Sequence, residues 1–143
     1  EGQTVAISGD GAVEPDRIVQ NGKVSLQFPA KKACVGFAYK TVIARQPDLQ
    51  NADADKKVKK ISDVILRLYK TVCAKAGRTE SDAVDITFRS AGDAMTRAVP
   101  LFTGDKPVNF GGGWDADADV VIVQEKPMPL FVLAVFASMM KGG

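Results

Sequence analysis

The sequence of 143 residues contains no histidine. Histidine is the commonest general base and the commonest metal ligand in proteins, so its absence excludes Ser-His-Asp and Cys-His nucleophilic sites within this chain. Carboxylate or lysine chemistry stays formally open, but no plausible catalytic triad supports a hydrolase. We therefore expect a protein that is not an enzyme, with no catalytic residues, no cofactor and no metal site.

A strong excess of charge is also missing, because 19 lysines and arginines face 17 aspartates and glutamates and leave a net charge of +2. So small an excess does not by itself indicate nucleic-acid binding. One basic cluster is present, formed by Lys56, Lys57, Lys59 and Lys60. We interpret it as a solvated loop or strand end, and the alternative is a phosphate-binding patch.

The chain has only two cysteines, Cys34 and Cys73, and their spacing fits neither a CxxC motif nor a zinc set. A disulfide between them is one alternative, but both lie among apolar residues, which favours buried free thiols. Free thiols suit assembly in a reducing cytoplasm. Long hydrophobic runs are missing as well, since the longest, Leu130 to Met140, is too short to span a bilayer.

The remaining composition is ordinary for a globular domain, with 45% hydrophobic and 25% charged residues. The length suits a single domain covering residues 1–143. The chain begins with Glu1 rather than Met, and we expect it to be a piece of a longer protein.

Short strand patterns, separated by turn residues at intervals of roughly ten residues, dominate the sequence. Polar and apolar residues alternate in Thr4–Ser8 and in Ala83–Arg89, where Val84, Ile86 and Phe88 share one face. The other expected strands are Arg17–Gln20, Lys23–Phe28, Ala33–Ala44 with a break at Gly36, Val99–Phe102, Val108–Phe110, Asp119–Gln124 and Leu130–Phe136. The pattern predicts an all-β fold, an antiparallel β-sandwich or partly open barrel of about nine short strands.

One turn is specified strongly by its residues. Asn21-Gly22 separates two strand patterns, and Asn-Gly is the strongest short hairpin signal because a type I′ turn needs a positive φ at both central residues. We predict a hairpin centred on Asn21-Gly22 and ended by Pro29. We interpret Gly9-Asp10-Gly11 and Thr103-Gly104-Asp105 as interruptions that end strands.

The segment Ile61–Cys73 fits two periodicities. Its apolar residues follow helical spacing, yet Val64, Leu66, Leu68 and Val72 also line one face of a strand. Periodicity alone does not decide between the two. The neighbouring strands favour the strand interpretation.

Alternating aspartates at positions 115, 117 and 119 invite comparison with a calcium site. An EF-hand loop needs glycine at its sixth position and glutamate at its twelfth, and this sequence has Val120 and Lys126 there. We therefore interpret Asp115, Asp117 and Asp119 as a solvated strand edge, with a cation site as the less favoured alternative.

Three further features give weaker signals. Gly111–Gly113 lacks the Gly-x-Gly-x-x-Gly spacing of a phosphate-binding loop, so we expect a flexible turn. Trp114 is the only tryptophan; a core or interface anchor is favoured over a sugar-stacking platform. Arg67 and Lys70 point outward on the strand interpretation, which suits a sheet edge or an intersubunit face.

A series of motifs runs through the chain in a fixed order. Asp10–Asp16 reads DGAVEPD, Val19–Leu26 reads VQNGKVSL and Pro100–Lys106 reads PLFTGDK. The further segments of the series are Ala33–Tyr39, Lys59–Arg67, Phe110–Asp115 and Ile122–Ala134. Together these segments resemble the C-terminal region of the tail-tube, or nozzle, proteins of short-tailed phages, which are also called tail tubular protein B or phage stabilisation protein.

The sequence departs from this family's pattern at three positions. Cys34 stands where the family has histidine, Ala38 where it has proline and Ala118 where it has glycine. The matching segments nevertheless cover nearly the whole chain, and they support the strand interpretation of Ile61–Cys73.

The resemblance implies a structural component of a phage virion tail, assembled in the host bacterial cytoplasm. The partners it implies are other copies of the parent protein in a sixfold ring, neighbouring tail or adaptor proteins, and the DNA that passes through the exit channel. It brings no catalytic residues with it. The alternative hypothesis is a tail module that binds a host glycan or surface protein, with Trp114, Tyr39 and Gly111–Gly113 as its candidate contacts.

Overall fold

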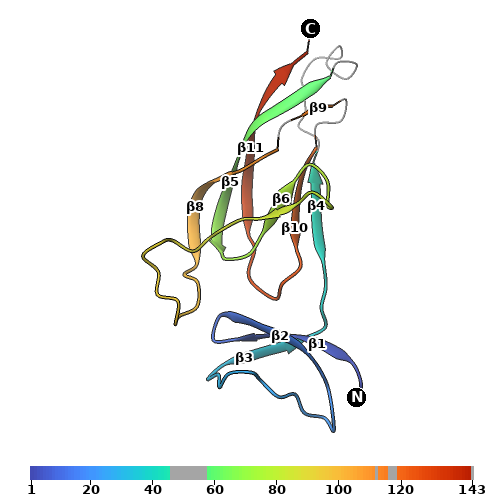
Figure 1. Ribbon diagram of the computed structural model, residues 1–143, viewed down its shortest axis with the longest axis vertical. Helices are drawn as coiled ribbons and strands as arrows, with labels where there is room; N and C mark the ends of the chain where they lie inside the picture. The colour runs from blue at the N-terminus through green and yellow to red at the C-terminus, as the bar shows by residue number, and fades with distance from the viewer. Residues whose placement is uncertain (46–57, 112, 116–118, 143) are drawn as a thin grey trace.

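Figure 1 shows the computed structural model of the chain, which describes residues 1–45, 58–111, 113–115 and 119–142. These residues form eleven strands and no helix. The strands are β1 (Thr4–Gly9), β2 (Ala12–Ile18), β3 (Ala33–Gly36), β4 (Thr41–Arg45), β5 (Lys59–Thr71), β6 (Lys75–Gly77), β7 (Val84–Asp85), β8 (Phe102–Val108), β9 (Trp114–Asp115), β10 (Val120–Gln124) and β11 (Val132–Lys141).

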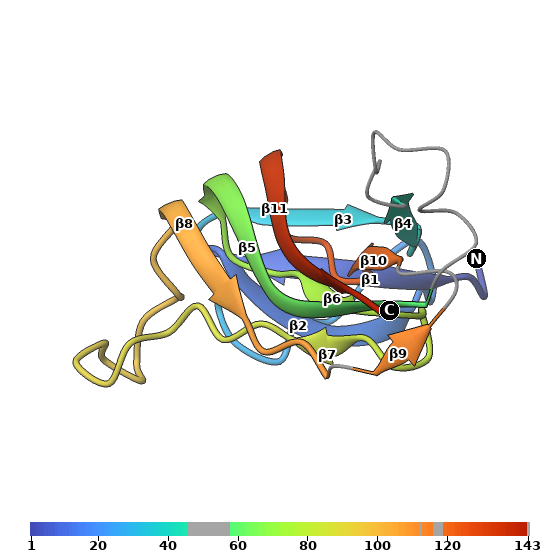
Figure 2. The ribbon, with the colours of Figure 1, turned by 90° about the horizontal axis from the view of Figure 1, so that it is seen from above.

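The strands form three antiparallel sheets. A three-stranded sheet of order β2-β1-β3, which we call the N-terminal sheet, lies at one end of the molecule (Figure 1). The other two sheets have the orders β4-β10-β6-β7 and β11-β5-β8, and β9 pairs with the start of β5. They pack face to face around one core (Figure 2), so the all-β prediction is confirmed as a sandwich, and no sheet in the described ranges closes into a barrel. The count exceeds the expected nine or so because the single pattern at Ala33–Ala44 gives two strands and because β6 and β9 are too short to give a sequence pattern.

The core of the sandwich is apolar and lies between its two sheets. Its buried residues come mainly from β5, β6 and β10 and from the connections beside them: Ile61, Val64, Leu66, Leu68, Ala74, Ala76, Phe88, Phe110, Val120 and Ile122. Leu66 and Leu68 are fully buried, and burial of a leucine side chain stabilises a fold by about 1.5–3 kcal/mol. The core therefore explains why β5 is the central strand of its sheet.

The ambiguous segment Ile61–Cys73 is a strand, as predicted, and forms most of β5. Burial alternates from Val64 to Tyr69, and the alternation ends at Lys70, which has a φ of 44°. The pairing of β5 with β8 shifts between Leu68 and Thr71, so Thr71 becomes a buried residue. We predicted Val72 on this face, and the irregularity at Lys70 explains why it is only partly buried.

The hairpin prediction at Asn21-Gly22 is partly wrong. Both residues have positive φ, 53° and 66°, as a type I′ turn requires, but the flanking pairing is a single bridge between Gln20 and Lys23. The following segment is not a strand, since the backbone amide of Gln27 instead donates to the carboxylate of Glu14 at 2.9 Å. The conformation of the turn is therefore as predicted, whereas the strands expected on its two sides do not form a hairpin.

A longer hairpin lies at Asp10-Gly11, where the sequence pattern predicts only an interruption that ends a strand. These two residues join β1 to β2 with φ values of 46° and 83°, so Asp-Gly here fills the same role as Asn-Gly in a type I′ turn. The Asp10 carboxylate accepts hydrogen bonds from the backbone amides of Lys31 and Lys32, both at 2.9 Å. This side chain thereby holds residues 31–32 beside the turn.

Several other expected boundaries also need correction. The strand expected at Arg17–Gln20 is only the end of β2, the pattern Ala83–Arg89 forms only the short β7, and of Val108–Phe110 only Val108 is in a strand, as the last residue of β8. The strand expected at Val99–Phe102 begins only at Phe102 and continues through Thr103-Gly104-Asp105, because pairing with β5 extends to Val108. Gly104 takes a φ of 140° within it. The strand pattern at Ala33–Ala44, broken at Gly36, corresponds to two strands, β3 and β4, which belong to different sheets.

Candidate interaction surface

The outer face of the sheet β11-β5-β8 is unusually apolar. Directly opposite residues of an antiparallel pair share a face, and Ile65 of β5 lies opposite Phe136 of β11. Both point away from the core, since their neighbours Val64 and Leu66 are buried. Six large apolar side chains on or beside β5 and β11 are between 39% and 63% exposed: Ile65, Tyr69, Phe131, Leu133, Phe136 and Met140. We call these six residues the apolar strip.

Aromatic contacts order one end of the strip. The rings of Tyr69 and Phe131 meet edge to face, with centroids 6.4 Å apart, a geometry that aromatic pairs favour. Phe131 is fixed by its backbone, because its amide donates to Thr71 Oγ1 and its carbonyl accepts from the Tyr69 amide, each at 3.0 Å. Part of the strip is thus a preformed surface.

A charged pair lies beside the strip. The Arg67 guanidinium donates two hydrogen bonds to the Asp105 carboxylate, at 2.7 and 2.8 Å, and lies 5.0 Å from the centre of the Phe136 ring. The hydrogen bond from Arg67 lowers the pKa of Asp105, and the same contact raises the pKa of Arg67. The pair is neutral as a unit, so a partner that covers this face would meet no unbalanced charge here. Arg67 and Lys70 are exposed, as predicted.

Strand β11 is an edge strand, paired on one side only within the described ranges. Proteins usually protect such edges with charged residues, prolines or bulges. β11 has ten residues, no proline and one charged residue, the terminal Lys141. Two irregularities interrupt its pairing with β5, near Leu133 and between Ser138 and Met139. The edge therefore has irregularities in its pairing but almost no charge, and it is largely apolar.

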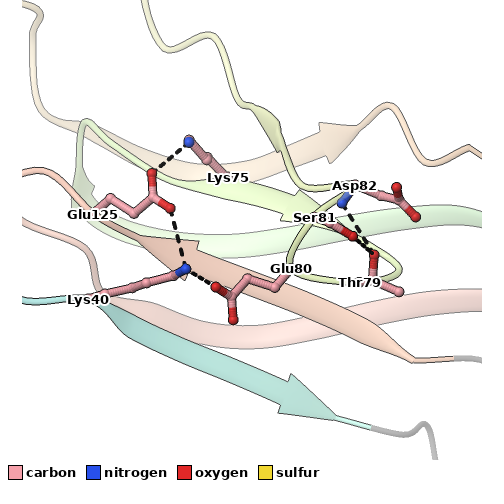
Figure 3. A network of polar contacts seen from close by, with 7 residues as sticks. All are labelled: Lys40, Lys75, Thr79, Glu80, Ser81, Asp82 and Glu125. Atoms are coloured by element: carbon pink, nitrogen blue, oxygen red, sulfur yellow. Dashed lines mark hydrogen bonds and ion pairs between the residues drawn. The ribbon is translucent and has the colours of Figure 1, made fainter.

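The opposite sheet carries a polar network instead (Figure 3). Lys40, just before β4, pairs with Glu80 of the β6–β7 turn and lies 3.7 Å from Glu125. Glu125 also accepts a hydrogen bond from Lys75 at 2.6 Å, which lowers the pKa of this carboxyl. Thr79 accepts from the Asp82 amide within the same turn. This network ties the edge strand β4 to the far side of its sheet, and no sequence pattern predicts it because its members are distant in the chain.

The candidate contacts of the glycan hypothesis are not brought together. Trp114 is 53% exposed on β9 and Tyr39 is 65% exposed in the link between β3 and β4. β9 lies at the end of the sandwich that is farther from the N-terminal sheet (Figure 1). Trp114 is therefore not a core anchor, which corrects half of our interpretation. In the glycine run, Gly112 lies outside the described residues.

The acidic string does not form a described cluster. Asp115 pairs with Arg78, and Asp117 lies outside the described residues. Among the residues that are described, no group of three or more His, Cys, Asp or Glu side chains is placed to hold a metal ion. The expectation of no metal site stays a prediction.

The basic cluster is only partly a solvated strand end. Lys59 and Lys60 begin β5, and Lys59 is buried rather than solvated, because it is paired with β9 on one side and β11 on the other. Lys56 and Lys57 lie outside the described residues.

Both cysteines are free thiols, as the favoured interpretation predicted. The expected burial is wrong for Cys34, which is exposed on β3, whereas Cys73 is partly buried. Partial burial raises the pKa of the Cys73 thiol, and the nearby positive charge of Lys126 opposes that rise.

Comparisons with known proteins give no family for this chain. A scan against protein-family models finds no match, and a search of curated proteins finds none either. In the described ranges, no helix is long and apolar enough to cross a membrane.

Proposed function

We propose that this chain is a structural module of the tail tube, or nozzle, of a short-tailed phage, and that it acts through protein–protein assembly around the DNA exit channel. The observation that carries the proposal is the ordered series of motifs from Asp10 to Ala134. The apolar strip supports it, because a large exposed apolar surface on a protein often marks a site of protein–protein contact.

The size of the strip fits an assembly role. Each of its six side chains leaves about half of its surface exposed, which amounts to roughly 500–600 Å² for side chains of this size. Two such surfaces in contact would bury about 1,000–1,200 Å², close to the lower bound for a specific interface. The partners of this proposal are other copies of the parent protein in a sixfold ring, together with neighbouring tail or adaptor proteins.

The direct test is the location of the chain in particles. We expect mass spectrometry of purified virions to detect peptides of this chain, and gold-labelled antibodies raised against it to bind at the tail. Virions that lack the chain, or label confined to the capsid, would overturn the proposal.

A second candidate function is binding of a host glycan or surface protein, which the exposure of Trp114 and Tyr39 favours. A glycan array and a cell-binding assay with the purified chain separate the two functions. Binding that Trp114→Ala removes, and that a substitution in the apolar strip leaves intact, would favour the second.

A further inference from the structure

A cleft separates the N-terminal sheet from the sandwich. Its volume is about 670 Å³, within the range of small-molecule sites. One wall comes from the β1–β2 turn and residues 28–30, and the other from the end of β5 and the connections that precede β8 and β11. In the described ranges, no strand of the N-terminal sheet is paired with a strand of the sandwich, so the cleft lies between side chains of two different sheets and their connections.

The walls are held in place by charged side chains that bind backbone groups. On one side Asp10 accepts from the amides of Lys31 and Lys32, and Glu14 accepts from the amide of Gln27. On the other side the Arg89 guanidinium donates to two backbone carbonyls, those of Ala94 at 2.7 Å and Arg97 at 3.0 Å. These two hydrogen bonds fix the position of the loop that carries Met95 and Arg97.

Two carboxylates, of Asp10 and Glu14, and three cations, of Arg89, Arg97 and Lys126, line the cleft, so its formal charge is +1. The carboxylates of Asp10 and Glu14 and the guanidinium of Arg89 are occupied by the backbone. The side chains of Arg97 and Lys126 also line the cleft, and no hydrogen bond or ion pair joins either to a described residue. Arg97 and Lys126 are thus available to an anionic group, while the carboxylates of Asp10 and Glu14 keep their charge and are hydrogen-bonded to backbone amides.

The rest of the lining is mostly apolar. Phe28, Val72, Val99 and Met128 contribute side chains from both walls. Ligand sites typically combine such apolar walls with a few placed polar groups. A ligand that matches this lining has an aliphatic body and one anionic head.

We propose that the cleft binds a small amphipathic anion, with a carboxylate or sulfate head between Arg97 and Lys126 and an aliphatic chain against Phe28 and Met128. The site is independent of the apolar strip, and the proposal does not rest on a role in the phage tail.

Cys73 provides a reporter inside the same cleft, since its partly buried thiol lines the wall. Cys34 is exposed on β3 and is absent from the cleft lining, so it is an internal reference. The experiment titrates the whole chain with decanoate below its micellar concentration, follows binding by calorimetry, and measures the rate at which each thiol reacts with Ellman's reagent.

We expect saturable binding that slows the reaction of Cys73 and leaves that of Cys34 unchanged. Lys126→Glu and Arg97→Glu each weaken binding by about tenfold, since each reverses one exposed charge beside the head group. Lys23→Glu, an equal change of charge in the turn that follows β2 and outside the cleft, leaves binding unchanged. Decanol, which has the same chain without the charge, binds more weakly than decanoate.

Three results would overturn the proposal: no saturable binding, binding that does not protect Cys73, or equal effects of the three charge reversals. If Lys126→Glu disturbs the fold, as circular dichroism would show, Arg97→Glu decides, because Arg97 is exposed on a loop outside every strand.

Discussion

Asp10 shows how one exposed carboxylate can hold a turn and a distant segment together. Its two backbone hydrogen bonds, to Lys31 and Lys32, lower its pKa from the ordinary value of 3.8. A carboxyl whose pKa is lower in the folded state adds stability above its unfolded pKa and loses it as the pH falls through the folded value. Asp105 and Glu125 have lowered pKa values for a similar reason, through hydrogen bonds from Arg67 and Lys75.

We therefore predict that the urea midpoint of the wild-type chain falls as the pH drops below about 4. Asp10→Asn should lower the midpoint at neutral pH and flatten part of this dependence, because asparagine tolerates the positive φ but is uncharged. Asp16→Asn is the control, since the exposed Asp16 makes no hydrogen bond or ion pair with a described residue. Equal pH profiles for Asp10→Asn and the wild type would contradict the prediction.

Gly77 lies where two backbone segments approach closely at the β6–β7 turn. A Cβ at this position would lie 2.8 Å from the Cα and amide nitrogen of Ala83 and from the carbonyl oxygen of Asp82. We predict that Gly77→Ala lowers the free energy of unfolding by about 1–3 kcal/mol, the usual cost of overpacking. Gly36→Ala is the matched control, because nothing lies within 4 Å of its Cβ position. Urea denaturation measures both, and equal effects would show that the turn moves freely.

Strand β5 allows a comparison of its two faces with adjacent residues. Leu66 is fully buried, whereas Ile65 is exposed on the outer face. We predict that Leu66→Ala costs about 2–5 kcal/mol of stability and that Ile65→Ala costs much less. Chemical denaturation of the two variants gives this difference directly. Similar losses would mean that the outer face is covered in the isolated chain.

At the same scale, the sequence predicts strands better than their ends. Local alternation identified β1, because a half-buried strand has a period of two, and a continuous apolar run identified β10. β5 was identified only with the help of its neighbouring strands and the family resemblance. The continuation of β8 through Thr103-Gly104-Asp105 depends on its partner β5, and the burial of Thr71 depends on an irregularity at Lys70. Such features arise from pairing between distant segments, so a local pattern does not contain them.

The candidate surface could be predicted only in part, because one of its strands has a local apolar pattern and the other contributes through pairing. The sequence showed that Leu130–Met140 has apolar residues on both faces, and the structure places one of these faces outside, on the edge strand β11. Ile65 and Tyr69 join the strip only through the pairing of β5 with β11. The contribution of β5 could not be recognised before the order of strands was known.

For the whole molecule, the apolar strip predicts weak self-association. A strip of this size on one chain is near the lower bound of a stable interface, so we expect a monomer at micromolar concentration and a rising mass at higher concentration. Leu133→Asp should abolish the rise, because it puts a charge at the most exposed position of the strip, 63% exposed. Static light scattering over a concentration series measures the mass.

The control is Met95→Asp, which changes an apolar residue that is 83% exposed but lies in a loop away from β11. It should leave self-association unchanged. If both variants disperse the chain equally, the contact does not depend on the strip. A stable hexamer of the wild-type chain would contradict the weak association expected here, while supporting the proposed ring.

The order of strands also bears on how the chain folds as it is synthesised. The N-terminal sheet uses only residues 4–36, so its contacts are local. The sandwich pairs β4 with β10 and β5 with β11, segments that are far apart in sequence, as in the opposition of Val64 and Ala137. Contacts over such separations form slowly because a long loop must close first. On the ribosome the N-terminal sheet can therefore form early. β5, in contrast, lacks its partner strand β11 until the C-terminal residues have been synthesised.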